Sequence, residues 1–295
     1  MPASTSKRWI LISGASTGIG RAMTLDLLAQ GYHVMAGVRK AADADELRRL
    51  ASAQSPQHGR TLETMILDVT KAEDIQRAKA WCDTLAAQGD SLWSVINNAG
   101  IVVVSPAEFI PIDELRKQMD VNFIGAVALT QAALSALRSS GGRVVNISSI
   151  SGRLSLPFTW PYSASKYAME AWSDGLRMEL RPLGVDVVLI EPGSIQTPIW
   201  EKSLRTNRDL FDRLPETART LYGTELNALQ SRIEQTNRGA DVSIVCKAVR
   251  KALSARSPRT RTLVGTDAKI LIWFKRLLPD RWFDAFIRKG LTSSE

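Results

Sequence analysis

The 295-residue sequence is poor in the side chains that hold metals or cross-link a chain. It has two cysteines, Cys82 and Cys246, and two histidines, His33 and His58. They do not form a cluster with zinc-ligand spacing, so we expect no metal site. Two scattered cysteines also exclude a disulfide framework and favour a reducing compartment, which predicts a cytoplasmic protein.

Internal repeats, low-complexity segments and linkers are missing as well. The apolar residues 9–12 after Lys7 and Arg8 are too few for a signal peptide, and we expect them to form the first strand behind a short polar tail. With 44% hydrophobic residues the chain can bury a large core. Strand-like and helix-like patterns alternate, which predicts an α/β fold: one Rossmann-like domain over residues 1–295, with a doubly wound parallel sheet and helices on both faces.

Acidic residues are scarce at the carboxyl end. Residues 247–295 hold twelve Lys and Arg against four Asp and Glu, which equals the net charge of +8 for the whole chain. Within the basic extension, about residues 256–295, the segment 270–289 interleaves Trp and Phe with Lys and Arg. That pattern is typical of a peripheral helix on an anionic membrane, and it is too short to span a bilayer. Packing on its own domain or on a second subunit is the alternative, and no motif for nucleic-acid binding accompanies the charge.

A glycine-rich turn follows the first expected strand. Gly14, Gly18 and Gly20 lie between residues 9–12 and a helical pattern of apolar residues. Strand, glycine turn and helix form the context of a dinucleotide site, in which the glycines permit the tight turn, the approach of a pyrophosphate and close packing of the helix. The spacing G-x-x-x-G-x-G departs from the usual G-x-G-x-x-G, so a simple turn is the alternative.

Tyr162 and Lys166 stand four positions apart, and Ser149 precedes Tyr162 by thirteen. If residues 162–180 are helical, the two side chains share one face and the ammonium favours the phenolate. A phenol has a reference pKa of about 10, so its ionisation at pH 7 requires about 4 kcal/mol, part of which the cation supplies. Ser149, after the expected strand 143–147, would hydrogen-bond a carbonyl or alcohol oxygen, and Tyr162 would exchange its proton. An ordinary tyrosine beside a solvated lysine is the alternative.

Six ordered motifs between residues 10 and 198 resemble the short-chain dehydrogenase/reductase family. They are residues 13–20, Asn97-Asn98-Ala99-Gly100, Val121-Asn122-Phe123-Ile124-Gly125, Ser149, Tyr162 with Lys166, and residues 192–197. The resemblance implies a catalytic set of Asn122, Ser149, Tyr162 and Lys166. Asn122 would hold a water that links Lys166 to solvent, Ser149 would orient the substrate oxygen, Tyr162 would be the general acid or base, and Lys166 would also bind the nicotinamide ribose. Ser148 is the rival for the serine role, and the thirteen-residue spacing favours Ser149.

The resemblance also implies a nicotinamide dinucleotide. Its expected contacts are Gly14, Ser16, Thr17, Gly18, Ile19, Gly20, Arg39, Asp68, Val69, Asn98, Ala99, Gly100, Tyr162, Lys166, Pro192, Gly193, Ile195 and Thr197. A carboxylate after the second strand binds the 2'-hydroxyl of NAD, whereas a basic residue accommodates the 2'-phosphate of NADP. Val38 fills the acidic position and Arg39 follows it, which predicts NADP(H). A solvated loop charge is the alternative role for Arg39.

The substrate is expected to be lipophilic. Residues 197–239 match the family's variable substrate loop and carry apolar side chains suited to short amphipathic helices. Residues 162–193 and 277–281 resemble the branch with retinol and 17β-hydroxysteroid dehydrogenases, which implies a steroid-, retinoid- or fatty-type alcohol or ketone. A 3-ketoacyl thioester reductase and a dinucleotide-binding protein without turnover are the alternatives. The family also implies a homodimer or homotetramer, assembled through helices near residues 113–138 and 161–181.

Overall fold

One parallel sheet forms the centre of the molecule. The computed structural model describes residues 7–54, 60–197, 199, 210–236 and 239–292. The seven strands lie in the order β3-β2-β1-β4-β5-β6-β7, and every neighbouring pair is parallel. Their bounds are β1 (Arg8–Ile12), β2 (His33–Val38), β3 (Leu62–Ile66), β4 (Ser91–Asn97), β5 (Arg143–Ile147), β6 (Asp186–Pro192) and β7 (Arg261–Val264).

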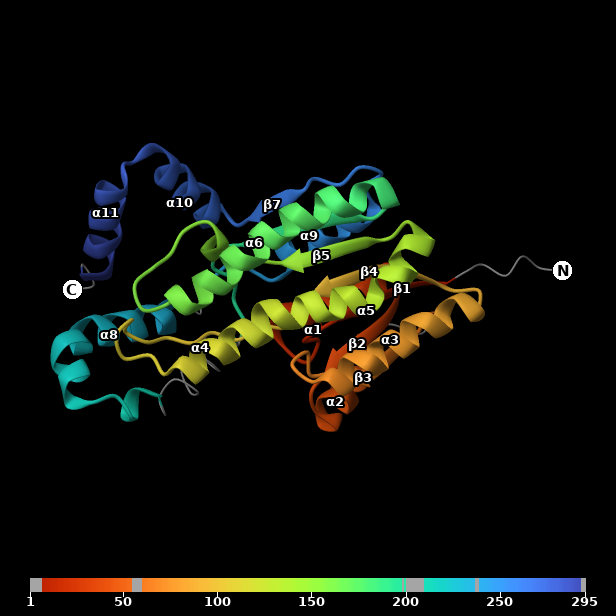
Figure 1. Cartoon of the computed structure of the whole chain (residues 1–295), viewed down its shortest axis with the longest axis horizontal. Helices are drawn as coiled ribbons and strands as arrows, with labels where there is room; N and C mark the ends of the chain where they lie inside the picture. The colour runs from red at the N-terminus through yellow and green to blue at the C-terminus, as the bar shows by residue number, and fades with distance from the viewer. Residues whose placement is uncertain (1–6, 55–59, 198, 200–209, 237–238, 293–295) are drawn as a thin grey trace.

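Helices cover both faces of the sheet, so the expected doubly wound α/β fold is confirmed (Figure 1). One face packs against α1 (Gly18–Ala29), α2 (Ala41–Gln54) and α9 (Ser243–Ser254). The other packs against α3 (Ala72–Ala87), α5 (Gly125–Ser140) and α6 (Trp160–Leu180). The described residues also include α4 (Ile112–Met119), a π-turn (Asp120–Ile124), two 3-10 turns (Ile150–Gly152 and Arg181–Leu183), α8 (Glu216–Thr236), α10 (Thr266–Leu277) and α11 (Asp280–Thr292).

The first strand shows why the sequence forms a central strand. Successive side chains of a strand point to opposite faces of the sheet. Ile10 and Ile12 accordingly belong to the core on the α1 side, whereas Trp9 and Leu11 belong to the core on the α3 side. All four are at most 3% exposed, as a central parallel strand requires.

Two buried asparagines connect the neighbouring strands β4 and β5. Asn97 and Asn146 are paired in register, and Asn97 Nδ2 donates to Asn146 Oδ1 at 2.8 Å. Asn97 Nδ2 also donates to Thr130 Oγ1 of α5 at 2.8 Å, and Asn146 Nδ2 donates to Ser173 Oγ of α6 at 2.8 Å. The amides therefore join two strands and two helices inside the core.

Both cysteines are buried on opposite sides of the sheet. Cys82 of α3 and Cys246 of α9 belong to different core clusters, so they form no disulfide with each other. Burial raises the pKa of each thiol to about 12. Both side chains act as packing groups.

The helical segment Ile112–Ser140 joins α4, the π-turn and α5, and it has the length and composition of a membrane-spanning helix. Its α5 part, however, packs on β4 and α3, with Leu129, Ala133 and Leu137 buried in the core. This packing against the sheet and α3 accounts for the apolar composition of α5. The sequence predicts helices near residues 113–138 and 161–181 but not the π-turn between α4 and α5.

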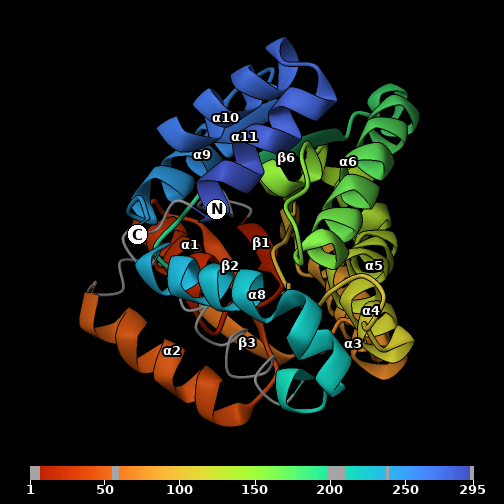
Figure 2. The ribbon, with the colours of Figure 1, turned by 90° about the vertical axis from the view of Figure 1, so that its left-hand side faces the viewer.

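The carboxyl ends of the strands meet at one edge of the sheet. In Figure 1 the strand arrows point left, toward α8 and α11, and Figure 2 shows these two helices standing before that edge. The order reverses between β1 and β4, and ligands of open α/β sheets bind outside the strand ends at such a point. The described part of the expected substrate loop 197–239, which includes α8, lies at this edge (Figure 1). Residues 198, 200–209 and 237–238 of the loop lie outside the described residues.

Candidate functional site

The glycine turn after β1 forms the first wall of the site. Gly14 and Gly18 have φ of +66° and +55°, which only glycine adopts readily. A Cβ on Gly14 would lie 2.8 Å from Ala99 Cα, and a Cβ on Gly20 would collide with the Gly14 carbonyl. The turn is therefore a backbone cradle next to the amino terminus of α1, where N–H groups attract a phosphate. Ser16, Thr17 and Ile19 lie within this turn and the start of the helix.

Asn98 supports the turn from the end of β4. Its Nδ2 donates to the carbonyl oxygens of Ser13 and Gly14, each at 3.0 Å. The backbone N–H groups of Asn98 and Ala99 both donate to Ser13 Oγ at 3.1 Å. Asn98 was predicted as a cofactor contact, and the structure uses its side chain to shape the cradle; Ala99 and Gly100 continue along its rim.

The end of β2 places Arg39 beside Asp68. Val38 is 1% exposed in the core, while Arg39 is exposed. Asp68 accepts hydrogen bonds from Thr70 N at 3.1 Å and from Thr70 Oγ1 at 2.7 Å. Burial of Asp68 acts to raise its pKa, but these bonds and the charges of Arg39 and Lys71 outweigh it, so the pKa is lowered. Val69, beside Asp68, packs against Gly125 of α5. Arg39 and the ionised carboxylate of Asp68 thus lie where the adenosine end of the expected cofactor would bind.

The chemistry-bearing side chains gather at the ends of β5 and α6. Tyr162 is hydrogen-bonded to Ser149, and Lys166 Nζ lies 5.7 Å from the centroid of the Tyr162 ring. Ser148, the rival serine, is 3% exposed and its Oγ has no hydrogen-bond partner. The structure therefore brings Ser149, rather than Ser148, to the tyrosine.

Burial controls the charge states of Tyr162 and Lys166. It raises the pKa of Tyr162 to about 12, and the hydrogen bond with Ser149 offsets only part of that rise. The expected lowering by Lys166 is not realised, because Lys166 Nζ donates to Ile147 O at 2.8 Å and not to the phenol. Burial lowers the pKa of Lys166 to about 8, and the charge of Glu170 opposes the change. At pH 7 the tyrosine is protonated and the lysine is mostly a cation.

Asn122 lies in the π-turn and is fully buried. Its Oδ1 accepts from Ile101 N at 2.8 Å, and its Nδ2 donates to Ile101 O at 3.0 Å and to Ser165 Oγ at 3.1 Å. Ser165 precedes Lys166, so Asn122 joins the loop after β4 to the helix of Tyr162 and Lys166. π-Turns of this kind often occur at functional sites.

The chain after β6 closes the other side of the site. Gly193 N donates to Val264 O at 2.8 Å, and Asp267 of α10 accepts from Ser194 N at 2.7 Å. Ile195 is 4% exposed and pairs with Ala240, and Thr197 is half-buried beyond it. Pro192 to Thr197 therefore run along the same edge of the sheet as the glycine turn.

Apolar side chains surround Tyr162. Val102, Val104, Tyr162 and Leu229 form a buried cluster, against which Phe158, Ile199, Phe211 and Ile287 pack. Phe158 has φ +64°, a strained value for a bulky residue. The sequence motifs did not indicate Phe158 or Ile287 of α11 as neighbours of Tyr162; only the apolar residues of the segment 197–239 predicted an apolar wall at the site. The motifs also did not indicate Glu170, which lies one helical turn beyond Lys166.

Comparison with known proteins gives a consistent result. The family model described as short chain dehydrogenase matches residues 8–208. Retinol dehydrogenase 5 of Mus musculus is 34% identical over 295 residues, covering 97% of this chain and 89% of the relative. The 3-amino-tetrahydro-pyrrolizinone reductase of Xenorhabdus hominickii is 33% identical over 286 residues, covering 95% and 96%.

Solved structures match over almost the whole chain. A short-chain dehydrogenase from Streptomyces avermitilis superposes with a TM-score of 0.73 at 27% identity, covering 99% of this chain and 100% of that one. A short-chain dehydrogenase from Burkholderia cenocepacia in complex with NADP gives a TM-score of 0.67 at 25% identity, with 98% of each chain covered. Together with the retinol dehydrogenases among its relatives, these matches show that the chain belongs to the short-chain dehydrogenase/reductase family and resembles its retinol dehydrogenase branch.

Proposed function

We propose that this oxidoreductase transfers a hydride between NADP(H) and a lipophilic alcohol or ketone, with Tyr162 as the general acid or base. The hydrogen bond between Tyr162 and Ser149, at the border between the glycine cradle and an apolar wall, carries this proposal. A substrate oxygen bound between these two side chains would be within hydrogen-bonding reach of the hydroxyl groups of both Tyr162 and Ser149.

The cradle fits a dinucleotide. Side chains are excluded at Gly14 and Gly20, so backbone N–H groups can approach a pyrophosphate there. Arg39 would pair with a 2'-phosphate, Asp68 would lie toward the adenine, and Thr197 toward the carboxamide. NADP(H), when bound, supplies or accepts the hydride. The complex of the Burkholderia cenocepacia relative with NADP supports the choice of cofactor.

The residues of the chain handle the proton. With a pKa of about 12, Tyr162 holds its proton at neutral pH and can donate it to a carbonyl oxygen, which favours reduction. Ser149 orients that oxygen. The Lys166 ammonium, fixed on Ile147 O, would bind the nicotinamide ribose, and Asn122 positions Lys166 through Ser165.

The apolar wall supports a lipophilic substrate. A second cluster, with Leu214, Ala218 and Leu226 at its centre, extends the wall through Phe158, Phe211 and Tyr222. Phe158 and Tyr222 meet edge to face with centroids 6.0 Å apart. Apolar side chains of this kind beside two hydroxyl groups suit a hydrophobic molecule with one oxygen function. The retinol dehydrogenases among the relatives make a retinoid or steroid the first class to test.

A carbonyl screen tests the proposed function. NADPH oxidation is followed over steroid, retinoid and fatty ketones and over 3-ketoacyl thioesters, with the wild type and Tyr162→Phe. Tyr167→Phe is the matched control, because Tyr167 lies on the same helix and is 45% exposed. We expect at least a 100-fold loss of kcat/KM in Tyr162→Phe and none in Tyr167→Phe.

Each alternative has its own outcome in this screen. Turnover of acyl thioesters alone would show a 3-ketoacyl reductase, whose basic extension docks an acidic carrier. Cofactor binding without turnover in the wild type would show a non-catalytic dinucleotide-binding protein. Equal activity of Tyr162→Phe and wild type would refute the role of Tyr162.

We also propose peripheral contact of α10 and α11 with an anionic membrane. One side of this pair packs on its own domain, where Ile272 and Phe283 are buried against Leu154. The other side exposes Trp273 and Trp282 by 58% and 69%, among basic residues. Exposed tryptophans with lysines and arginines are typical of an interfacial surface.

Because Ile272 and Phe283 are part of the core, point variants are a better test than deletion of the extension. We expect the double variant Trp273→Ser and Trp282→Ser to lose sedimentation with phosphatidylserine vesicles. Leu183→Ser, at a position 51% exposed in the turn Arg181–Leu183, should retain it. If the double variant sediments with the vesicles as fully as the control variant and the wild type, membrane contact through α10 and α11 is excluded.

We further propose a homo-oligomer assembled through α5 and α6. Ile124, next to α5, and Tyr167 and Met178 of α6 are 52%, 45% and 67% exposed. Light scattering of Met178→Asp should show a smaller species than the wild type. Leu221→Asp on α8, at a position 56% exposed, is the control. An unchanged mass of Met178→Asp would refute this interface.

A further inference from the structure

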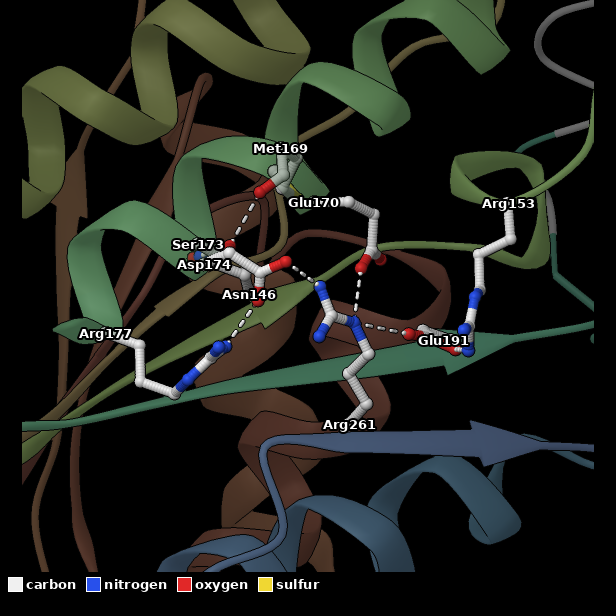
Figure 3. A network of polar contacts seen from close by, with 9 residues as sticks. All are labelled: Asn146, Arg153, Met169, Glu170, Ser173, Asp174, Arg177, Glu191 and Arg261. Atoms are coloured by element: carbon white, nitrogen blue, oxygen red, sulfur yellow. Dashed lines mark hydrogen bonds and ion pairs between the residues drawn. The ribbon is translucent and has the colours of Figure 1, made fainter.

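A cluster of ionic side chains lies between α6, β6 and β7 (Figure 3). Its carboxylates Glu170 and Glu191 are 7% and 0% exposed. Arg261 Nε donates to Glu170 Oε2 at 2.9 Å and lies 3.4 Å from Glu191 Oε1. Arg153 Nη1 donates to Glu191 Oε2 at 3.1 Å. Buried carboxylates remain ionised only when they are paired, so the two arginines hold them in place.

The cluster joins the segments that form the proposed active site. Arg153 ends the short turn behind Ser149, Glu170 lies one helical turn beyond Lys166, and Glu191 directly precedes Pro192. The turn and the helix are in close contact, since a Cβ on Gly152 would lie 2.9 Å from Glu170 Cγ. Movement of Glu170 would therefore disturb the segments of both Ser149 and Lys166.

Glu170 is the charged side chain next to Lys166 on α6. Residues 162, 166 and 170 follow at four-residue steps and share one face of the helix. From β5, Lys166 meets the carbonyl oxygen of Ile147, and from the π-turn the neutral Asn122 lies beside its neighbour Ser165. The charges of Arg261, Glu191 and Arg153 stand behind Glu170 on β7, β6 and the turn after β5.

We propose that Glu170, held by Arg261, is a positioning residue that keeps the Lys166 ammonium charged and directed at the site. A carboxylate one turn away stabilises the ammonium against the effect of burial. Arg261 binds that carboxylate, so Glu170 does not fold back to neutralise Lys166 in a direct pair. Lys166 Nζ thus stays on Ile147 O. The inference rests on the proposed function, in which Lys166 acts as a cation.

The variant Glu170→Gln tests the inference, because it keeps the shape and removes the charge. The titration of Lys166 is followed by NMR of lysine labelled with 13C at Cε in the cofactor-free protein, with Lys166→Met for assignment. The pH profile of kcat/KM is measured beside it. We expect both midpoints to fall by about one pH unit from about 8 in the wild type. At pH 8 the cationic fraction, and with it kcat/KM, should then drop about fivefold.

Two further variants separate positioning from a merely structural role. Asp174→Asn is the matched control, because Asp174 Oδ2 also binds Arg261, at 2.6 Å, but lies two turns from Lys166. We expect its Lys166 midpoint to stay within about 0.3 unit of the wild type. Arg261→Gln removes a positive charge behind Glu170, so the Lys166 midpoint should rise.

An unchanged NMR midpoint in Glu170→Gln, or an equal fall in Asp174→Asn, would overturn the inference. Should Glu170→Gln not fold, Arg261→Gln decides in the same way, and a midpoint that stays or falls there refutes the positioning role. The failure of the proposed function gives a different result. In that case Tyr162→Phe keeps its activity, whereas the Lys166 titration of the cofactor-free protein still responds to Glu170.

Discussion

Replacement of Asn122 by leucine measures what the π-turn contributes to the site. The asparagine is fully buried and makes three hydrogen bonds, two with the backbone of Ile101 and one with Ser165 Oγ. Leucine has a similar size but makes none of them. Three such bonds contribute about 1 kcal/mol each, and the partly buried N–H of Ile101 left without Asn122 adds about 1 kcal/mol more. We expect Asn122→Leu to lower the free energy of unfolding by about 4 kcal/mol.

Urea denaturation followed by tryptophan fluorescence measures this loss, and the melting temperature should fall by about 10 °C. Gln118→Leu is the matched control. Gln118 is also fully buried, and its two hydrogen bonds connect α4 to Val103 N and Ile101 O, each at 2.7 Å. Its loss should be smaller, about 3 kcal/mol, because two hydrogen bonds are lost and the buried N–H of Val103 is left without Gln118. A loss below about 1 kcal/mol in Asn122→Leu, or one smaller than in Gln118→Leu, would refute the idea that Asn122 anchors the loop and the helix.

Three other substitutions address the cofactor cradle and the lysine. Gly20→Val should abolish NADPH binding in a fluorescence titration, since its Cβ would collide with the Gly14 carbonyl, whereas Gly175→Ala, with open space around it, should bind normally. Arg39→Asp should reverse the preference for NADPH over NADH by at least about tenfold in kcat/KM; an unchanged ratio would show that Arg39 does not read the 2'-phosphate. Lys166→Met should change how stability depends on pH. The folded pKa of about 8 lies below the ordinary 10.5, so the unfolded chain binds this proton more tightly, and wild-type stability rises by about 3 kcal/mol between pH 8 and pH 10.5. The variant should lack that rise; a parallel pH dependence of both proteins would contradict the lowered pKa.

The order of elements and the edge that carries the site could be predicted from the sequence. Glycine turns and short apolar runs are local signals, and the carboxyl ends of parallel strands meet at one edge. Hence the sequence places the glycine turn of Gly14 after the first strand and Ser149 after the strand 143–147. The spacing of Tyr162 and Lys166 on one helix was equally local.

The surroundings of Lys166 could not be predicted, because they depend on contacts between distant parts of the chain. Arg261 binds Glu170 across 91 positions, and nothing in the sequence near either residue indicates the other. The pKa of Tyr162 likewise follows from burial by Phe158 and its neighbours, which a helical spacing does not reveal. The sequence shows which residues are charged, but it does not show which of them form ion pairs.

The aromatic extension shows a different limit of sequence reasoning. Membrane contact and packing on its own domain were alternatives for residues 270–289, yet α10 and α11 bury Phe283 on one side and expose Trp282 on the other. The packing alternative is therefore present in the structure, and the exposed side leaves room for a second role. The spacing of apolar and charged residues shows that a helix is amphipathic, but it does not show which surface packs against each side of the helix.

The paired amides of Asn97 and Asn146 have a consequence for how the chain reaches its fold. If β5 slipped by one residue so that Asn146 lay beside Ile96 and Asn97 beside Ile147, the two amides would no longer pair with each other, which costs about 1 to 3 kcal/mol for each buried group left unpaired. The aliphatic residues around them would tolerate such a slip far better. These two side chains thus favour the correct register of β4 and β5. A sheet with the wrong register would shift Ser149, which follows β5, relative to the glycine turn.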